Sequence, residues 1–132
     1  MKSIGPLIMS LALWACNAQN DRSAVDYSTI EIPVDRLASD DARARGRALF
    51  QKKCALCHGV HADGNGVRQQ GLSGAPANFQ SRDWRMNASP RQVYMVLSEG
   101  KRGTSMPAWP TLSDAEKWEV VAYVLSVAED GP

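Results

Sequence analysis

The chain has 132 residues, of which 44% are hydrophobic and 22% charged, and its formal net charge is +1. This length suits one domain, and the composition excludes a wholly disordered chain. No apolar run reaches the ~18 residues of a membrane-spanning helix, and three cysteines are too few for a disulfide-stapled scaffold. Residues 43–102 hold eleven Lys and Arg against three acids, whereas the flanks are acidic. This basic middle suits an acidic partner surface, although an ordinary solvated surface explains it equally well.

Residues 1–15 are predicted to be a signal peptide. Lys2 gives a short positive start, and the mostly apolar stretch of residues 4–15 fits a secretory signal but is too short to cross a bilayer. The end of this stretch, Leu-Trp-Ala-Cys, resembles the lipobox of bacterial lipoproteins, in which the cysteine is lipidated and becomes the mature N-terminus. That resemblance implies a lipid on Cys16, and the alternative is an ordinary signal peptide cleaved after Ala18. In both cases we expect the chain to be exported.

Residues 16–40 are predicted to be a lipid-anchored N-terminus followed by a flexible linker. They are acidic and lack helical periodicity, and a strand-like patch near residues 30–34 is expected to lie on the domain. A fully extended chain of this length reaches at most about 80 Å. Residues 41–132 are predicted to form the folded domain.

Three helices are expected in this domain from apolar periodicity and capping signals. They cover residues 42–53, capped by Asp40 or Asp41, then residues 89–100, and residues 113–127. Gly46 within the first helix would permit the close approach of another helix. Residues 59–89 are rich in Gly, Asn, Pro and Ser and are predicted to be loop. A loop of this length in a small domain makes sense if it wraps a large apolar group that is not protein.

Residues 54–58 read Cys-Ala-Leu-Cys-His, and this motif decides the interpretation. Cys-x-x-Cys-His is the attachment signal of c-type haem. Two cysteines three apart at a helix end can both reach the haem vinyl groups and form thioethers. His58 then lies beneath the iron and can bind it through a ring nitrogen. Cys54, Cys57 and His58 are therefore predicted to hold one covalent haem c.

Three other interpretations of the motif are weaker. A thioredoxin-type redox pair would follow a strand, and no strand-like run precedes Cys54. A zinc site with His61 would crowd all its ligands into one turn. A structural disulfide between Cys54 and Cys57 would leave His58 unexplained.

The second axial ligand of the iron is predicted to be Met106. It lies between a glycine and a proline, in a rigid loop that can present a thioether to the metal. Met86 and Met95 are expected to be packing residues. His61 lies too close to His58 along the chain to reach the opposite haem face.

The pattern of glycines, aromatics and haem-binding residues resembles a class I c-type cytochrome domain with one haem. The match runs over residues 46–125 and rests on Gly46, Phe50, the haem motif, Gly59, residues 64–66, residues 106–109, Trp118 and Tyr123. The resemblance implies an all-α fold of three to five helices, with long loops that wrap a covalently bound haem. It also implies that Gly46, Phe50 and Tyr123 meet where the first and last helices cross.

Two finer features of the haem pocket follow from the same resemblance. A proline carbonyl typically accepts the N–H of the haem-binding histidine, and Pro76 is the candidate. Trp109 or Arg68 is a candidate to contact the haem propionates, although a packed aromatic and a solvated arginine explain these two residues equally well.

Histidine and methionine at both axial positions would leave the iron no open site for a substrate. The expected function is one-electron transfer through an exposed haem edge, with no catalytic residue and no enzyme activity. We expect an electron carrier on the periplasmic side of a bacterial membrane, anchored by the lipid on Cys16, that serves exported or membrane-bound redox partners. These partners would present acidic docking surfaces, and nucleic acid is not expected among them.

Two alternatives to a free carrier remain open. The first is a dedicated cytochrome subunit of a membrane oxidoreductase or respiratory complex. The second is a haem enzyme or gas-binding protein, which would need an open iron position and is disfavoured by Met106.

Overall fold

The computed structural model describes residues 25–129, and within them the chain is helical and forms no strand. This confirms the predicted all-α class. In chain order the elements are the 3-10 helix η1 (Tyr27–Thr29) and the α-helices α1 (Val34–Ala38), α2 (Asp40–Lys53), α3 (Ala55–His58), α4 (Arg82–Asn87), α5 (Pro90–Glu99) and α6 (Asp114–Glu129). The three longest, α2, α5 and α6, are the predicted ones. Short α1, α3 and α4 bring the number of α-helices in the described residues to six, against the three to five expected. None of the described helices is long and apolar enough to cross a bilayer.

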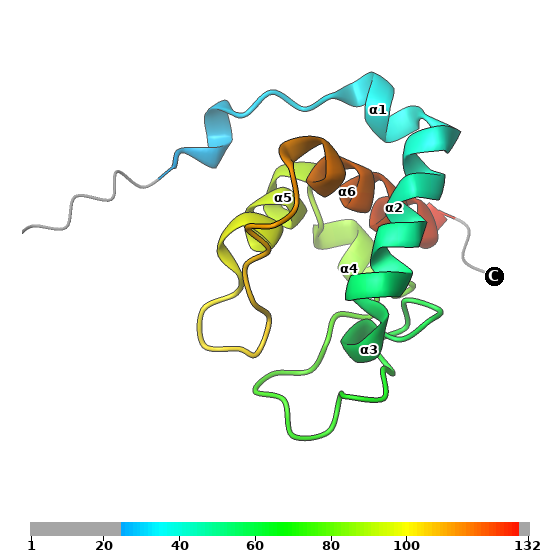
Figure 1. Cartoon of the computed structure of the whole chain (residues 1–132), viewed down its shortest axis with the longest axis vertical. Helices are drawn as coiled ribbons and strands as arrows, with labels where there is room; N and C mark the ends of the chain where they lie inside the picture. The colour runs from blue at the N-terminus through cyan, green and yellow to red at the C-terminus, as the bar shows by residue number, and fades with distance from the viewer. Residues whose placement is uncertain (1–24, 130–132) are drawn as a thin grey trace, which may run out of the picture.

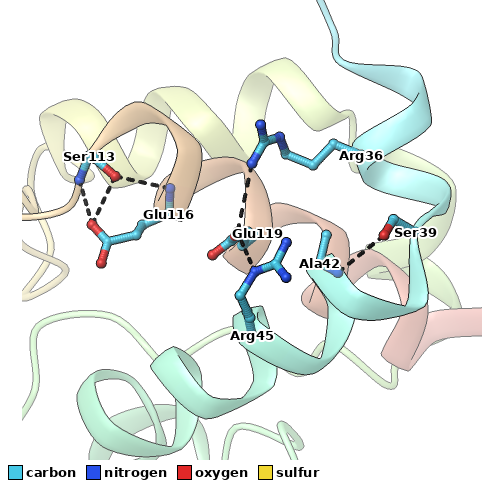
Figure 2. Close-up of polar contacts among 7 residues, drawn as sticks. All are labelled: Arg36, Ser39, Ala42, Arg45, Ser113, Glu116 and Glu119. Carbon is cyan, nitrogen blue, oxygen red and sulfur yellow. Dashed lines mark hydrogen bonds and ion pairs between the residues drawn. The ribbon is translucent and has the colours of Figure 1, made fainter.

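Side-chain caps start the long helices. The Ser89 hydroxyl accepts a hydrogen bond from the N–H of Gln92, with Pro90 in the first turn, as predicted for α5. At the start of α6, Ser113 and Glu116 form the expected reciprocal capping box, shown in Figure 2. The cap of α2 differs from the prediction. Ser39 accepts the N–H of Ala42, whereas the two aspartates that follow Ser39 lie in the first turn, where they favour the helix dipole instead.

The core of the domain forms where α2 crosses α6. A Cβ on Gly46 would collide with the backbone carbonyl of Glu119, so only glycine lets the two helices approach this closely. One turn further along α2, Phe50 is 1% exposed and packs edge-on against Tyr123 with ring centroids 5.1 Å apart. Val121 and Val124 of α6 are fully buried in the same cluster. The expected meeting of Gly46, Phe50 and Tyr123 at a helix crossing is confirmed.

A buried carboxylate ties α1 and α2 to α6. The Glu119 side chain is only 10% exposed, and its Oε1 lies 2.7 Å from Arg45 Nε and 3.7 Å from Arg36 Nη1 (Figure 2). A carboxylate removed from water is costly unless cations compensate it. The two arginines therefore make the position of α1 depend on α6.

The described part of the predicted linker folds onto the helices. We call residues 25–39 the collar. Tyr27, Ile30, Ile32 and Leu37 pack against the hydrophobic core, and Arg91 of α5 donates to the Ile30 carbonyl at 2.8 Å. The expectation that the patch near residues 30–34 lies on the domain is confirmed, but the flexible linker is wrong for residues 25–39, because their apolar side chains pack on the core. The expected strand is wrong, because residues 30–33 find no strand to pair with and α1 begins at Val34.

The predicted loop of residues 59–89 is interrupted by α4. Ser81 caps this helix by accepting the N–H of Trp84, and the Trp84 ring packs edge-on against Phe79 at 4.8 Å. Met86, expected to pack, is instead 73% exposed. The reason is that α4 packs Trp84, which is half-buried, against Phe79 and leaves Met86 facing solvent. In Figure 1, α3 and the loop after it lie at the bottom of the molecule, and the collar runs across the top.

Candidate haem site

The two cysteines of the motif lie at the junction of α2 and α3. Cys54 ends α2, and its N–H donates to the Phe50 carbonyl at 2.8 Å. Both thiols are free, so no disulfide joins Cys54 to Cys57. Burial raises the pKa of the Cys54 thiol to about 11, the opposite of the lowered pKa that activates redox cysteines. Within residues 25–129 no three His, Cys, Asp or Glu side chains gather in a possible metal site.

His58 is held in one ring orientation. Its Nδ1 lies 3.2 Å from the Ala77 carbonyl, and the Phe79 ring stacks on it at 4.9 Å. Donation from Nδ1 to this carbonyl selects the tautomer whose Nε2 has a free lone pair. Burial lowers the pKa of His58, which favours the neutral imidazole that a metal needs. The side chain is thus prepared to bind a metal through Nε2.

The prediction that Pro76 accepts the histidine N–H is wrong by one residue. The Phe79 N–H donates to the Ala62 carbonyl at 2.9 Å, and this contact sets the position of the segment that precedes it. The carbonyl that meets His58 is therefore that of Ala77. The Pro76 carbonyl instead faces Gly64, where a Cβ would lie 3.0 Å from it.

The loop after His58 folds back over α3 and satisfies its last carbonyls. Gly66 donates to the Cys57 carbonyl at 3.2 Å, and Arg68 donates to the Leu56 carbonyl at 2.8 Å. A Cβ on Gly66 would collide with the backbone of Leu56 and Cys57, so the close approach needs glycine. The Arg68 side chain is exposed, as expected of a solvated arginine.

Met106 lies in a turn that is fixed at both ends. Its N–H donates to the Thr104 hydroxyl at 3.2 Å, and its carbonyl accepts the Lys101 N–H at 3.0 Å. The neighbouring Ser105 exchanges two hydrogen bonds of 2.9 Å with Ser73, which we call the Ser73–Ser105 bridge. The bridge joins the loop that carries Met106 to the loop that follows His58. We define residues 54–81 and 100–113 as the haem end of the domain.

The surroundings of Trp109 indicate whether these residues could hold a haem. Its indole Nε1 is buried and has no hydrogen-bond partner, and Lys53 Nζ lies 5.8 Å from the centre of its ring. A buried donor without an acceptor costs roughly 1–3 kcal/mol. A haem propionate is an acceptor that would satisfy the indole beside a compensating cation. The residues present therefore fit the group that the motif implies.

Three features of this site escaped the sequence analysis. Ala77 carries no side-chain signal, and neither partner of the Ser73–Ser105 bridge belongs to a motif. Ser81, the cap of α4, could have been found, because serine is a preferred residue at the start of a helix.

Comparison with known proteins agrees with this geometry. The family described as "Cytochrome C oxidase, cbb3-type, subunit III" matches residues 41–124. The chain is 32% identical over 98 residues to the cbb3-type cytochrome c oxidase subunit CcoP of Rubrivivax gelatinosus, covering 73% of this chain and 30% of that protein. It is 30% identical over 96 residues to a thiosulfate dehydrogenase of Allochromatium vinosum, covering 72% of this chain and 35% of that protein. The aligned region thus spans about a third of these relatives.

A solved structure supports the same fold. A chain of the reducing HAO-like protein complex of Kuenenia stuttgartiensis superposes with a TM-score of 0.63 and 26% identity, covering 78% of this chain and 49% of that one. The helical fold, the Cys-x-x-Cys-His motif at the end of α2 and the family match all agree. The chain therefore belongs to the class I c-type cytochromes, which carry covalent haem c and transfer electrons.

Proposed function

We propose that Cys54 and Cys57 bond covalently to a single haem c and that His58 and Met106 bind its iron from opposite faces. The observation that carries this assignment is the hydrogen bond from His58 Nδ1 to the Ala77 carbonyl, which leaves Nε2 as the metal-binding atom. The Ser73–Ser105 bridge supports Met106, because it joins the Met106 loop to the loop that follows His58.

The chain's own residues give the site its electron-transfer character. Haem c held by these residues would supply one-electron oxidation and reduction. His58 and Met106 would both bind the iron and leave substrates no place to bind, and the soft thioether of Met106 would favour the reduced state. The rings of Phe50 and Phe79 exclude water from the His58 side. The Ala77 carbonyl holds the Nδ1 proton in place, so electron transfer requires no proton movement at His58.

The proposed setting is the periplasmic side of a bacterial membrane. Cys16 lies outside the described residues, and its resemblance to a lipobox cysteine supports a lipid anchor there. The basic stretch of residues 43–102 supports redox partners with acidic docking surfaces. The chain would then carry electrons between exported or membrane-bound proteins.

A dedicated subunit of a larger oxidoreductase is the second candidate. It is favoured by the names of two relatives, which are an oxidase subunit and a dehydrogenase, and by the small share of those proteins that this chain spans. Copurification from solubilised membranes separates the two: a subunit stays with its complex, and a carrier is recovered alone.

Replacement of Met106 by Ala tests the ligand assignment. Removal of the thioether should abolish the sulfur-to-iron charge-transfer band of the oxidised protein, lower the reduction potential and let the reduced protein bind carbon monoxide. Met86→Ala is the matched control, because Met86 is 73% exposed and should leave all three properties unchanged. A charge-transfer band that persists in Met106→Ala would refute the assignment.

A separate experiment tests the anchor. Cys16→Ser should move the protein from the membrane fraction to the soluble fraction, because the lipid supplies the attachment. The haem spectrum should not change. If the wild-type protein is already released by osmotic shock, the lipid anchor is wrong while the haem assignment stands.

A further inference from the structure

Two aromatic rings lie beside the His58 imidazole. The Phe79 ring stacks on it, with centroids 4.9 Å apart and planes 27° apart, and the Phe50 ring lies 6.2 Å away at a tilt of 51°. The torsion that turns a histidine ring has only a weak preference of its own, so the neighbouring side chains decide the plane of the ring. In a close-packed interior, a stacked ring has to be displaced before the imidazole can rotate. Phe79 is therefore placed to restrict the plane of His58.

The Phe79 ring is itself braced by other rings. Trp84 of α4 meets it edge-on, with centroids 4.8 Å apart and planes 83° apart. Phe50 of α2 meets it at 6.0 Å with planes 74° apart. Both contacts have the edge-to-face geometry that aromatic pairs prefer, and Phe79 is only 9% exposed. Helix α4 thus supplies a side chain that holds the ring stacked on His58.

The backbone of Phe79 is fixed as well. Its N–H donates to the Ala62 carbonyl at 2.9 Å. Ala62 is fully buried and has a φ of +58°, in the left-handed region that residues other than glycine adopt rarely. Such strain persists where the surrounding structure enforces it, and it is common at functional sites. The segment fixed in this way places the Ala77 carbonyl at Nδ1 of His58 and the Phe79 ring on the face of the same imidazole.

We propose that Phe79, braced by Trp84, is a positioning residue that fixes the plane in which the His58 imidazole binds the iron. This inference rests on the proposed binding of haem iron by His58 and Met106. The hydrogen bond to Ala77 selects the metal-binding nitrogen, and the stacked ring of Phe79 sets the rotation of the imidazole about its bond to the metal. In oxidised low-spin haem, the planes of the axial ligands determine how the unpaired electron spreads over the four pyrrole rings. Phe79 thereby influences which part of the haem edge exchanges electrons.

The test uses proton NMR of the oxidised holoprotein, because the shifts of the four haem methyl groups report the spread of the unpaired electron. Phe79→Leu removes the flat ring and keeps an apolar side chain. Trp84→Leu removes the brace, and Trp84→Phe, the conservative variant, keeps an aromatic edge. Leu37→Ala is the control for a general loss of stability, because Leu37 packs on the core from the collar.

We expect Phe79→Leu to change the order or the spacing of the four methyl resonances. Trp84→Leu should shift them in the same direction by a smaller amount, because the Trp84 ring contacts Phe79 and, in the described part of the chain, makes no ring contact with His58. Trp84→Phe and Leu37→Ala should keep the wild-type pattern. The sulfur-to-iron charge-transfer band should persist in all four variants, since Met106 is not altered.

An unchanged methyl pattern in Phe79→Leu, with the charge-transfer band present, would overturn this inference and leave the axial ligands standing. A wild type without that band would overturn the proposed ligands and the inference together. If Phe79→Leu does not retain haem, Trp84→Leu decides the question, and a wild-type pattern there would refute the brace. An equal change in Leu37→Ala would show that general loosening moves the resonances, which would also overturn the role of Phe79.

Discussion

The helix crossing and the haem end of this cytochrome are stabilised by different kinds of contact. At the crossing of α2 and α6, apolar side chains such as Phe50, Val121 and Val124 are removed from water almost completely. At the haem end, many backbone hydrogen bonds hold the loops, and Val60 and Val67 are 60% and 87% exposed, while Ala62 and Phe79 reach the hydrophobic core. The interior of the helix crossing consists of protein side chains. The loops of the haem end are expected to enclose the haem instead, so we expect mutations in the two regions to have different effects.

Loss of both motif cysteines should have the largest effect. Cys54→Ala with Cys57→Ala removes both thioether bonds and abolishes covalent haem attachment. Without haem the loops of the haem end have nothing to enclose, and we expect the domain to lose cooperative folding. Denaturing mass spectrometry measures the attachment, and thermal unfolding followed by circular dichroism measures the folding. The single variants, which keep one thioether, are the controls. A double variant that still unfolds cooperatively without haem would mean that the crossing is sufficient by itself.

Gly46→Ala should damage the crossing while leaving the haem site chemically intact. The new methyl group would collide with the Glu119 carbonyl, so the helices must separate, and the free energy of unfolding should fall by about 3 kcal/mol. Gly71→Ala is the control at the haem end. Gly71 has a φ of +82° and open space around it, so that substitution should cost only about 1 kcal/mol of backbone strain. Urea unfolding of the oxidised holoproteins compares them, and equal losses would contradict the close-approach role of Gly46.

Charge reversal at the haem end should change docking and little else. Lys101→Glu with Arg102→Glu should lower the association rate with an acidic partner about tenfold at low ionic strength. The haem spectrum should stay the same. Stopped-flow rates at increasing salt provide the check, because screening over a Debye length of about 8 Å should bring the variant and the wild type together. A wild-type rate that does not depend on salt would remove any docking role for these two residues.

The smallest predicted effect concerns the side of the domain under the collar. Tyr94 packs flat against Trp118, and its hydroxyl donates to Asp114 at 2.7 Å. Burial, followed by this hydrogen bond, raises the pKa of Tyr94 from 10.0 to about 12. A raised pKa contributes stability that is fully present below pH 10 and is lost as the pH rises towards 12.

Tyr94→Phe tests this dependence. The free energy of unfolding of the variant should be about 1 kcal/mol below that of the wild type at pH 7, because the hydrogen bond is missing. This difference should become smaller between pH 10 and 12. Urea midpoints at pH 8 and pH 11 measure the gap. A gap that stays constant with pH would show that the Tyr94 hydroxyl does not titrate in this range.

Local signals in the sequence predicted the features whose causes are local. The starts of α5 and α6 follow from Ser89 and Ser113 because a capping serine acts within three residues. The haem motif is likewise complete within five residues, and the prediction of Met106 rests on Gly103 and Pro107 close to it in the chain. These signals identified the fold class and the proposed haem-binding residues.

Features that depend on distant partners were not predictable in the same way. Helix α1 has no periodicity of its own, and it is secured by Leu37 in the core and by Arg36 beside Glu119, which lies on α6. The carbonyl that meets His58 is set by the contact between Phe79 and Ala62, so a choice between neighbouring residues needed the structure. The acidic composition of residues 25–39 suggested a flexible linker, whereas their packing on the helices forms the collar.

The Ser73–Ser105 bridge has a consequence for how the protein is made. Covalent attachment requires the two cysteines to be presented to a haem that is not yet enclosed. The two hydrogen bonds of the bridge connect loops that lie about thirty residues apart in the sequence. They can form only after the haem motif has been synthesised, because Ser105 follows the motif in the chain. Closure of the bridge would therefore follow haem attachment and complete the enclosure of the cofactor by the two loops.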